Sequence, residues 1–296
     1  MNLGIFGRIT RSTDLASLAS FFLFLTERGI GYRIHRDYAE SLAQHAPFDA
    51  LPHLLESRFE AIASRQDFRF LLSIGGDGTM LDAVRLVGPS AIPIVGVNVG
   101  RLGFLANVNQ HLLEQVTLDL QEGAFRTEER SLLTIDSHPV PLFAGSNFAF
   151  NEVTVHKSNS NEMIIIHAYI NGEFLNSYWA DGLIVSTPTG STAYSLACGG
   201  PIIAPQAASW VITPIAPHSL TVRPVVIPDT AVVSFELESR SGQALIALDN
   251  RNELVQDSIE IAVRKAEFCA HLVKLPAYSY FSTLRDRLNW GVDSRN

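Results

Sequence analysis

Residues 70–79, FLLSIGGDGT, decide the fold of the N-terminal half of this chain. The run FLLSI is continuously apolar, as expected of a β-strand that is buried on both faces of a sheet. The three glycines after it permit unusual backbone angles and let backbone N–H groups approach a ligand. A helix is predicted from about Met80 to Val87, before Gly88-Pro89. This order is typical of α/β proteins, which bind ligands at the carboxyl ends of parallel strands.

Short apolar runs alternate with helical patterns on both sides of this segment. The predicted strands are Leu3–Phe6, Gly31–His35 and Ile92–Val97, and the predicted helices are Leu15–Arg28, Leu54–Arg65 and His111–Gln121. Strands buried on both faces and alternating with helices indicate a parallel sheet in a Rossmann-like arrangement. We therefore expect an α/β domain over residues 1–125.

The pattern changes after about Phe125, where β-branched and partly alternating segments prevail. The predicted strands are Ser131–Asp136, Phe148–His156, Met163–Ile170, Leu183–Ser186, Ser219–Val222, Val232–Leu237, Ala244–Leu248 and Ile259–Val263. Within this region only Thr192–Ala197 and its surroundings have a helical pattern. We expect a β-rich domain over residues 126–274, with a helical tail (275–296) that rejoins the first domain.

Composition excludes several classes of protein. The chain has 296 residues, of which 47% are apolar and 18% charged, as in a globular protein. Its formal charge of -8 argues against nucleic acids and anionic membranes as partners. Two cysteines cannot form a disulfide framework, and the nine histidines show no zinc-ligand spacing. The apolar run Leu15–Leu25 is too short to span a bilayer and lacks a cleavage site, so we expect a cytoplasmic protein.

Asp77 determines the interpretation of the glycine loop. A loop that only binds phosphate would not place a carboxylate among its glycines, because the carboxylate repels phosphate. Asp77 fits a loop in which it accepts a proton from a hydroxyl or orients a metal ion. The alternative is that Asp77 caps the next helix by accepting from the N–H of Thr79 or Met80. None of the three lysines follows a P-loop pattern, and Leu81 replaces the third glycine of a dinucleotide fingerprint.

Two further segments are rich in polar groups. Residues 181–201, DGLIVSTPTGSTAYSLACGGP, combine a strand with an excess of hydroxyl side chains, which suits a polar ligand such as a ribose or an amide. The alternative is that Thr189, Ser191 and Thr192 only cap the following helix. Asn151-Glu152 interrupts the apolar run Phe148–Val155, and burial of such a pair is costly unless it is hydrogen-bonded. The alternative here is a bulge or a strand end at the surface.

Together these segments resemble the NAD kinase family, of the bacterial ATP-NAD kinase type. GGDGT (75–79) is moderately specific, because lipid kinases and phosphofructokinases have similar loops. TPTGSTAY (187–194), followed by Gly199-Gly200-Pro201, is far more specific. Further family-like segments are GVN (96–98), LGFL (102–105), Pro217-His218 with Arg223-Pro224, and Phe281–Trp290. The resemblance covers nearly the whole chain in the expected order.

The resemblance implies a Rossmann-like N-terminal domain and a β-rich domain that carries much of the NAD site and the contacts of a homodimer or homotetramer. It implies transfer of the γ-phosphate of ATP to the 2′-hydroxyl of the adenosine ribose of NAD, giving NADP. Mg²⁺ or another divalent metal is expected with ATP, and no residue is assigned as a metal ligand. Asp77 would be the general base that deprotonates the hydroxyl.

The resemblance also assigns binding residues. Asn151 and Glu152 would hold ribose hydroxyls, Asp181 would bind the nicotinamide end, and Phe104 would form a wall for a base. The adenine and ribose pocket would be shaped by Thr192, Ala193, Tyr194 and Ser195. The same family pattern places Gly76, Gly78, Thr79, Thr189, Ala197 and Asp249 at the nucleotide sites.

The chain departs from the family pattern at two positions, where Trp179 replaces a basic residue of many relatives and Glu162 replaces a histidine of some. These departures bear on the pyrophosphate contacts and not on the reaction.

Two alternatives to an NAD kinase stay open. One is a kinase for another alcohol, such as a lipid or a sugar phosphate, and the other is a non-catalytic NAD sensor.

Overall fold

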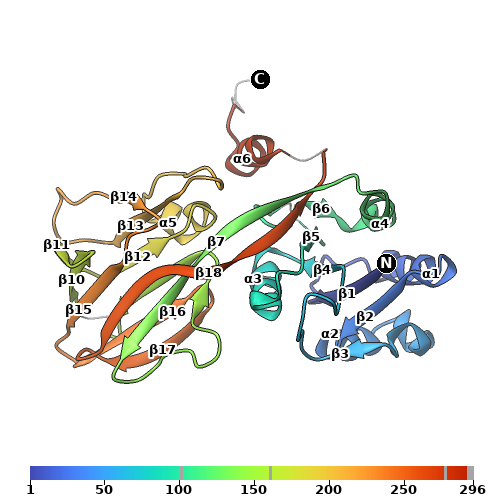
Figure 1. Ribbon diagram of the computed structural model, residues 1–296, viewed down its shortest axis with the longest axis horizontal. Coiled ribbons are helices and arrows are strands. Elements are labelled where there is room, and N and C mark those ends of the chain that lie inside the picture. The colour runs from blue at the N-terminus through green and yellow to red at the C-terminus, as the bar shows by residue number, and fades with distance from the viewer. Residues whose placement is uncertain (101–102, 160–161, 277–278, 292–296) are drawn as a thin grey trace. The chain divides into compact units, whose positions relative to one another are not determined.

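The computed structural model describes residues 1–100, 103–159, 162–276 and 279–291. The chain forms two compact units, which are treated separately below (Figure 1). The first unit comprises Met1–Glu129 and Ala270–Asn296, and the second comprises Arg130–Cys269. The chain passes from one unit to the other within β7 (Arg126–His138) and again within β18 (Glu260–Lys274).

A parallel sheet with the strand order β5-β4-β1-β2-β3 forms the centre of the first unit. Its strands are β1 (Asn2–Gly7), β2 (Gly31–His35), β3 (Arg58–Phe59), β4 (Phe70–Gly75) and β5 (Ile94–Asn98). β6 (Val108–Asn109) pairs with β5, and Leu272 of β18 pairs with Ile94. The α-helices are α1 (Leu15–Glu27), α2 (Arg36–Ala43), α3 (Asp77–Val87), α4 (Leu113–Glu122) and α6 (Tyr280–Leu288). Short 3₁₀ helices are η1 (Phe48–Ala50), η2 (Pro52–Leu55), η3 (Gly88–Ser90) and η4 (Gln110–Leu112).

The strand order places the glycine loop at a reversal of the sheet. From β1 the chain proceeds outward through β2 to β3, and then returns to β4 and β5 on the other side of β1. Ligands of open α/β sheets bind at the carboxyl ends of the strands where such a reversal occurs. In this unit that place lies between the ends of β1 and β4. Every residue of β4 is buried, as its apolar sequence predicts.

Most predicted elements of the first unit are confirmed, and one is wrong. Helix α1 begins after Asp14, whose side chain accepts from the N–H of Ser17, and ends before Gly29. The predicted helix Leu54–Arg65 does not form. Residues Arg58–Phe59 instead pair with the edge strand β2, a tertiary contact that overrides the local helical pattern. Helix α2, which directly follows β2, was not predicted.

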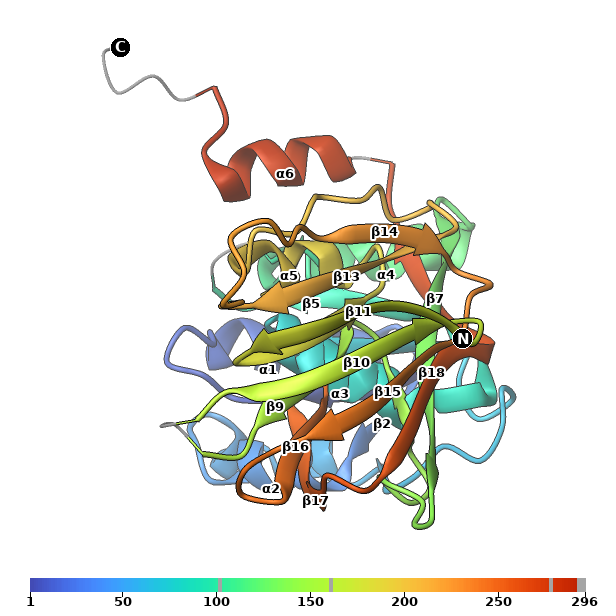
Figure 2. The same cartoon turned by 90° about the vertical axis from the view of Figure 1, so that its left-hand side faces the viewer.

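The second unit contains two antiparallel arrangements of strands. One is a six-stranded sheet, in the order β14 (Val225–Pro228), β13 (Ser209–Ile215), β12 (Gly182–Ser186), β9 (Glu152–Lys157), β16 (Gln243–Leu248) and β17 (Arg251–Gln256). The other has the order β11 (Glu173–Ala180), β10 (Ile164–Ile170), β15 (Val233–Glu238) and β18, which Figure 2 shows side by side. β7 pairs with β18, and β8 (Phe148–Ala149) pairs with β7. A core that includes Trp210, Phe235 and Tyr178 lies within this unit.

The helical segment near Thr192–Ala197 is confirmed as η5 (Gly190–Thr192) and α5 (Tyr194–Ala197). The predicted strand Ser219–Val222 is wrong, because these residues form a turn in which Leu220 is 89% exposed. Strand β13, which was not predicted, lies nearby and is almost fully buried.

The predicted fold class, an α/β N-terminal part and a β-rich C-terminal part, is confirmed. Among the residues that the structure describes, no helix has the length and apolar character needed to cross a bilayer.

Candidate functional site

Asp77 is the first residue of α3, and its side chain does not cap that helix. Gly76 occupies the cap position without a side-chain bond. The Asp77 carboxylate instead accepts three backbone hydrogen bonds from the loop after β5. The N–H of Phe104 donates to Oδ2 at 2.9 Å, and the N–H groups of Leu105 and Ala106 donate to Oδ1 at 3.0 and 3.1 Å. The helix-cap alternative is therefore wrong, and Asp77 joins the loops that follow two neighbouring strands.

This arrangement leaves the Asp77 carboxylate oriented and still able to accept one further hydrogen bond. A carboxylate has about four acceptor positions, of which Oδ1 uses two and Oδ2 uses one. The remaining position on Oδ2 can accept a hydrogen bond from a hydroxyl. Gly103 lies so close that a Cβ atom there would meet Oδ1 at 2.0 Å, so only glycine allows the approach. Added Cβ atoms at Gly76 or Gly78 would meet no atom within 4 Å, so the outer side of the loop is open.

The other predicted residues of the first unit lie around this carboxylate. Thr79 is buried in the first turn of α3. Phe104 is partly buried, and the guanidinium of Arg287 in α6 lies 5.7 Å from its ring centroid. Leu102 of the family-like segment lies outside the described residues, as do residues 277–278 and 292–296 of the tail.

Asn151 and Glu152 lie at the break between β8 and β9, and Asp249 holds them there. Asp249 lies in the turn between β16 and β17 with a φ of 53°. Its carboxylate accepts from the N–H groups of Phe150 (2.8 Å), Asn151 (2.7 Å) and Glu152 (3.2 Å). The arrangement repeats that of Asp77, because a single carboxylate binds three successive backbone N–H groups. The strand-end alternative for Asn151-Glu152 is confirmed in part, since β9 begins at Glu152 but both residues are buried.

Glu152 carries a buried carboxyl group with an unsatisfied oxygen. Its Oε2 has no hydrogen-bond partner among the described residues. Burial, with the nearby Asp249 carboxylate as a smaller cause, raises the pKa of Glu152 to about 8. Burial also raises the pKa of Asp249, against the effect of its three backbone donors. A ligand hydroxyl could therefore supply the hydrogen bond that Glu152 lacks.

The raised pKa of Glu152 predicts how stability depends on pH. Between its usual value of 4.5 and about 8, the folded chain holds a proton on Glu152 that the unfolded chain releases. Stability from this group is therefore greatest below pH 4.5 and falls as the pH rises to about 8. The quantity to compare is the free energy of unfolding of Glu152→Gln minus that of the parent. We expect this difference to be roughly 2–4 kcal/mol more favourable to the variant at pH 9 than at pH 5.

Urea unfolding at pH 5 and pH 9 checks this expectation. Glu173→Gln, which removes a carboxylate at an exposed position of β11, serves as the matched control. A Glu152→Gln difference that is the same at both pH values would contradict the expectation.

The hydroxyl-rich segment 181–201 uses many of its hydroxyls internally. Thr187 donates to the carbonyl of Phe150 and accepts from the N–H of Gly190. Ser191 donates to the carbonyl of Pro188 and accepts from the N–H of Ile203. The expectation that the excess of hydroxyls serves a ligand is therefore wrong for these two, which build the loop instead. Gly190 is required there, because a Cβ would meet the carbonyl oxygen of Asn151 at 2.2 Å.

The predicted residues of this segment differ in their access to solvent. The Ser195 hydroxyl is fully buried and hydrogen-bonded to Thr213 at 2.8 Å, so it supports the loop, and Thr189 is also buried. Tyr194 and Ala197 are exposed, whereas Thr192 and Ala193 are partly exposed. Tyr194, Ala197, Thr192 and Ala193 therefore contribute to the accessible surface of the segment.

Two residues that the sequence analysis did not single out connect this surface to Asp181. The ring of Tyr194 stacks on His156, with centroids 5.8 Å apart. Lys157 forms an ion pair with Asp181, with Nζ 2.6 Å from Oδ1. Burial lowers the pKa of His156, and the charge of Asp181 partly opposes the shift. The signal in the sequence was the polar pair His156-Lys157 at the end of an apolar strand.

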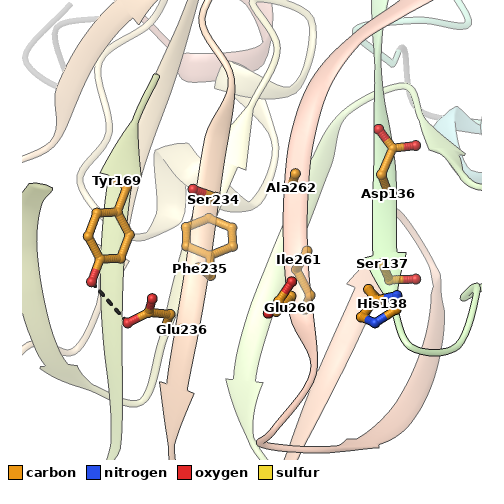
Figure 3. Close-up of a pocket in the computed structure, with 10 residues that line it drawn as sticks. All are labelled: Asp136, Ser137, His138, Tyr169, Ser234, Phe235, Glu236, Glu260, Ile261 and Ala262. Atoms are coloured by element: carbon orange, nitrogen blue, oxygen red, sulfur yellow. Dashed lines mark hydrogen bonds between the residues drawn. The ribbon is translucent and has the colours of Figure 1, made fainter. Parts of the chain in front are cut away.

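Two cavities of the second unit are lined by none of the predicted binding residues. One, of about 400 Å³, is lined by residues of β7, β10, β15 and β18 (Figure 3). Its carboxylates Asp136, Glu236 and Glu260 make it unsuited to phosphate groups. The other, of about 610 Å³, is lined by both Trp179 and Glu162, so the two departures from the family pattern lie on one cavity. Within the described part of the chain, no cluster of three or more His, Cys, Asp or Glu side chains is placed to bind a metal ion.

Comparison with known proteins identifies the family. Residues 4–124 match the model of the ATP-NAD kinase N-terminal domain, and residues 150–275 match that of the C-terminal domain. The NAD kinases of Cytophaga hutchinsonii and Bacteroides fragilis are 43% and 39% identical, each aligned over 100% of both chains.

Solved structures share the fold. Yeast NADH kinase complexed with NADH superposes with a TM-score of 0.82 at 24% identity, covering 99% of this chain and 88% of that one. An NAD kinase from Archaeoglobus fulgidus in complex with ATP gives a TM-score of 0.73 at 21% identity, covering 98% and 99%. Both family domains are matched, in order, over most of the chain, and the relatives are aligned with it over its full length. The chain therefore belongs to the NAD kinase family.

Proposed function

We propose that this chain transfers the γ-phosphate of ATP to the 2′-hydroxyl of the adenosine ribose of NAD, giving NADP and ADP. The observation that carries the proposal is the full-length similarity to relatives named NAD kinase, with both family domains matched in order. The open glycine loop at the reversal point of the parallel sheet supports it, since phosphate groups approach backbone N–H groups there without hindrance.

Asp77 acts in this proposal as the general base. A ribose hydroxyl is a poor nucleophile at neutral pH, so transfer of its proton to a positioned carboxylate assists its attack on the γ-phosphorus. The oxygen–phosphorus bond to ADP breaks as the new bond forms, and the proton passes to the free acceptor position of Oδ2. The three backbone donors of residues 104–106 keep the carboxylate in place.

Residues of the second unit bind NAD in this proposal. Asn151 and Glu152 hold ribose hydroxyls, which is supported by the buried Oε2 of Glu152 that lacks a partner. Asp181, with Lys157 beside it, binds the nicotinamide end. Tyr194 and its exposed neighbours contact the adenine and ribose, and Asp249 orients the Asn151-Glu152 backbone. Gly76, Gly78, Thr79 and Phe104 belong to the nucleotide sites of the first unit.

Mg²⁺ or another divalent ion enters this reaction bound to ATP. Mg²⁺ usually keeps several waters and binds through substrate phosphates and one or two carboxylates. It neutralises the phosphate charge during transfer. The described residues therefore need no dedicated metal cage.

The proposal is tested by incubating the protein with Mg-ATP and a panel of alcohols that includes NAD, a sugar phosphate and a diacylglycerol. We expect NADP as the product, measured with an NADP-specific dehydrogenase. Phosphorylation of another alcohol without NADP formation would favour the first alternative. Binding of NAD by calorimetry without NADP formation would identify a sensor.

We also propose a cytoplasmic homodimer or homotetramer. The edge strand β11 supports it, because Phe174 and Trp179 on this strand are each 55% exposed, which is costly for large apolar side chains in water. Light scattering after size-exclusion chromatography tests the assembly, and a monomer at micromolar concentration would contradict it.

A further inference from the structure

The first unit contains an arginine at the reversal point that has no role in the proposed reaction so far. Arg8 directly follows β1, and its backbone N–H donates to the carbonyl of Ile74 at 3.0 Å. Ile74 precedes Gly75-Gly76-Asp77, so Arg8 lies beside the start of the glycine loop. The loop that continues from Arg8 also reaches the end of β5, since a Cβ at Gly100 would lie 3.3 Å from Cβ of Ser12. The loops that follow β1, β4 and β5 are therefore neighbours.

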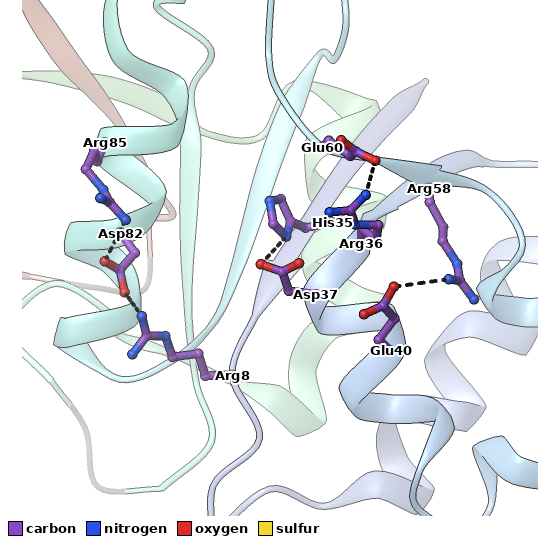
Figure 4. A network of polar contacts seen from close by, with 9 residues as sticks. All are labelled: Arg8, His35, Arg36, Asp37, Glu40, Arg58, Glu60, Asp82 and Arg85. Carbon is purple, nitrogen blue, oxygen red and sulfur yellow. Dashed lines mark hydrogen bonds and ion pairs between the residues drawn. The ribbon is translucent and has the colours of Figure 1, made fainter. Parts of the chain in front are cut away.

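A buried carboxylate fixes the direction of the Arg8 side chain. Nη2 of Arg8 lies 2.6 Å from Oδ2 of Asp82, which is on α3 five residues after Asp77 (Figure 4). The Asp82 side chain is 6% exposed and that of Arg8 is 62% exposed. A buried carboxylate is stabilised by a cation beside it, so the ion pair favours this position of the guanidinium. A guanidinium has five N–H donors in a planar fork, and most of those of Arg8 stay available to a second anion.

The position of Arg8 fits a polyphosphate better than a neutral ligand. The chain carries a formal charge of -8, and Asp77 itself repels the phosphates that must approach it. The start of α3 offers free backbone N–H groups and the positive end of the helix dipole, but these partial charges do not balance a triphosphate. A fixed guanidinium beside the loop supplies the missing charge and binds phosphate oxygens two at a time.

We propose that Arg8 binds the triphosphate group of the phosphoryl donor, and that Asp82 is the positioning residue that holds Arg8 beside the glycine loop. The proposal rests on the proposed function, and it names a donor-binding residue within it. A triphosphate group is assigned rather than the pyrophosphate of NAD, because the γ-phosphate must lie next to Asp77 for transfer and Arg8 borders the same loop.

Arg8→Gln tests the assignment against Arg85→Gln. Arg85 contacts the same Asp82, with Nη2 3.6 Å from Oδ1, but it lies later in α3 and away from the loop. We expect Arg8→Gln to raise the KM for ATP about tenfold and to change the KM for NAD by less than about twofold, as for a lost charge-assisted contact. Arg85→Gln should change neither. Arg8→Lys, which keeps the charge but loses the fork, should give an intermediate KM for ATP.

Inorganic tripolyphosphate separates the phosphate contact from contacts to adenosine. It should compete with ATP, and its inhibition constant should rise in Arg8→Gln by about the same factor as the KM for ATP. An unchanged inhibition constant, with a raised KM for ATP, would place Arg8 at the nucleoside and overturn the proposal. Asp82→Asn should raise the KM for ATP less than Arg8→Gln does, and thermal unfolding of each variant shows how much of the effect is loss of folded protein.

Other outcomes also overturn the assignment. A raised KM for NAD with an unchanged KM for ATP would assign Arg8 to the NAD pyrophosphate. Equal effects of Arg8→Gln and Arg85→Gln would show that the ion pairs only stabilise α3. If the parent chain makes no NADP, the proposed function fails, and calorimetric binding of tripolyphosphate to the parent and to Arg8→Gln still decides whether Arg8 binds phosphate.

Discussion

Asp77→Asn is expected to lower the turnover number for NADP formation by roughly 10²–10⁴-fold, which is the usual contribution of a general base. The substitution keeps the size of the side chain but removes the group that, in the proposed reaction, accepts the proton of the 2′-hydroxyl. The measurement is the rate of NADP formation at saturating NAD and ATP.

Structural damage from Asp77→Asn must be measured separately. Asn offers one acceptor oxygen where Asp77 uses two, so at least one N–H of Phe104, Leu105 or Ala106 loses its partner. The cost is about 1–3 kcal/mol of stability, read from urea unfolding. Asp67→Asn is the matched control, because Asp67 also accepts from two backbone N–H groups, those of Ala63 and Ser64, but lies in an exposed loop. Both N–H groups donate to Oδ2 of Asp67, and one amide oxygen can replace it, so this variant should lose little stability and keep its turnover. Near-normal turnover of Asp77→Asn would refute the role of Asp77 as base.

Asp249→Ala is expected to lower kcat/KM for NAD by roughly 100-fold and stability by about 2–4 kcal/mol. Three backbone N–H groups, those of Phe150, Asn151 and Glu152, lose their acceptor at once. The Asn151-Glu152 backbone then loses the conformation on which the proposed contacts of both residues with the ribose depend. Because the phosphate donor does not contact this segment in the proposed roles, the KM for ATP should change little.

Asp257→Ala provides the comparison for Asp249→Ala. Asp257 also accepts a backbone hydrogen bond in a turn of the second unit, and its donor, the N–H of Ser239, is not among the predicted NAD-binding residues. Its substitution should reduce stability slightly and leave NAD kinetics unchanged. If Asp249→Ala lowers stability but keeps its kcat/KM for NAD, then Asp249 has only a structural role.

The accuracy of the sequence-based predictions followed the strength of the local signal. Strand β4 and helix α1 were predicted because their apolar residues and the cap at Asp14 act within a few residues. The segment after Leu54 was predicted as a helix on local pattern alone, and its pairing with β2 overrode that pattern. The hydroxyls of Thr187 and Ser191 were counted as ligand groups because their partners, Phe150 and Ile203, are distant in sequence.

The sequence by itself determined the fold class, the family and the positions of the polar segments, because apolar periodicity and short motifs are local properties. Only the tertiary structure decided what the polar groups do. It joined Asp77 to the N–H groups of residues 104–106, Asp249 to those of residues 150–152, and Arg8 to Asp82. Each contact links residues from different loops or elements, and such pairs form only when the sheets bring distant strand ends together. Burial, which sets the pKa of Glu152, likewise depends on the packed fold and not on the residues beside it in sequence.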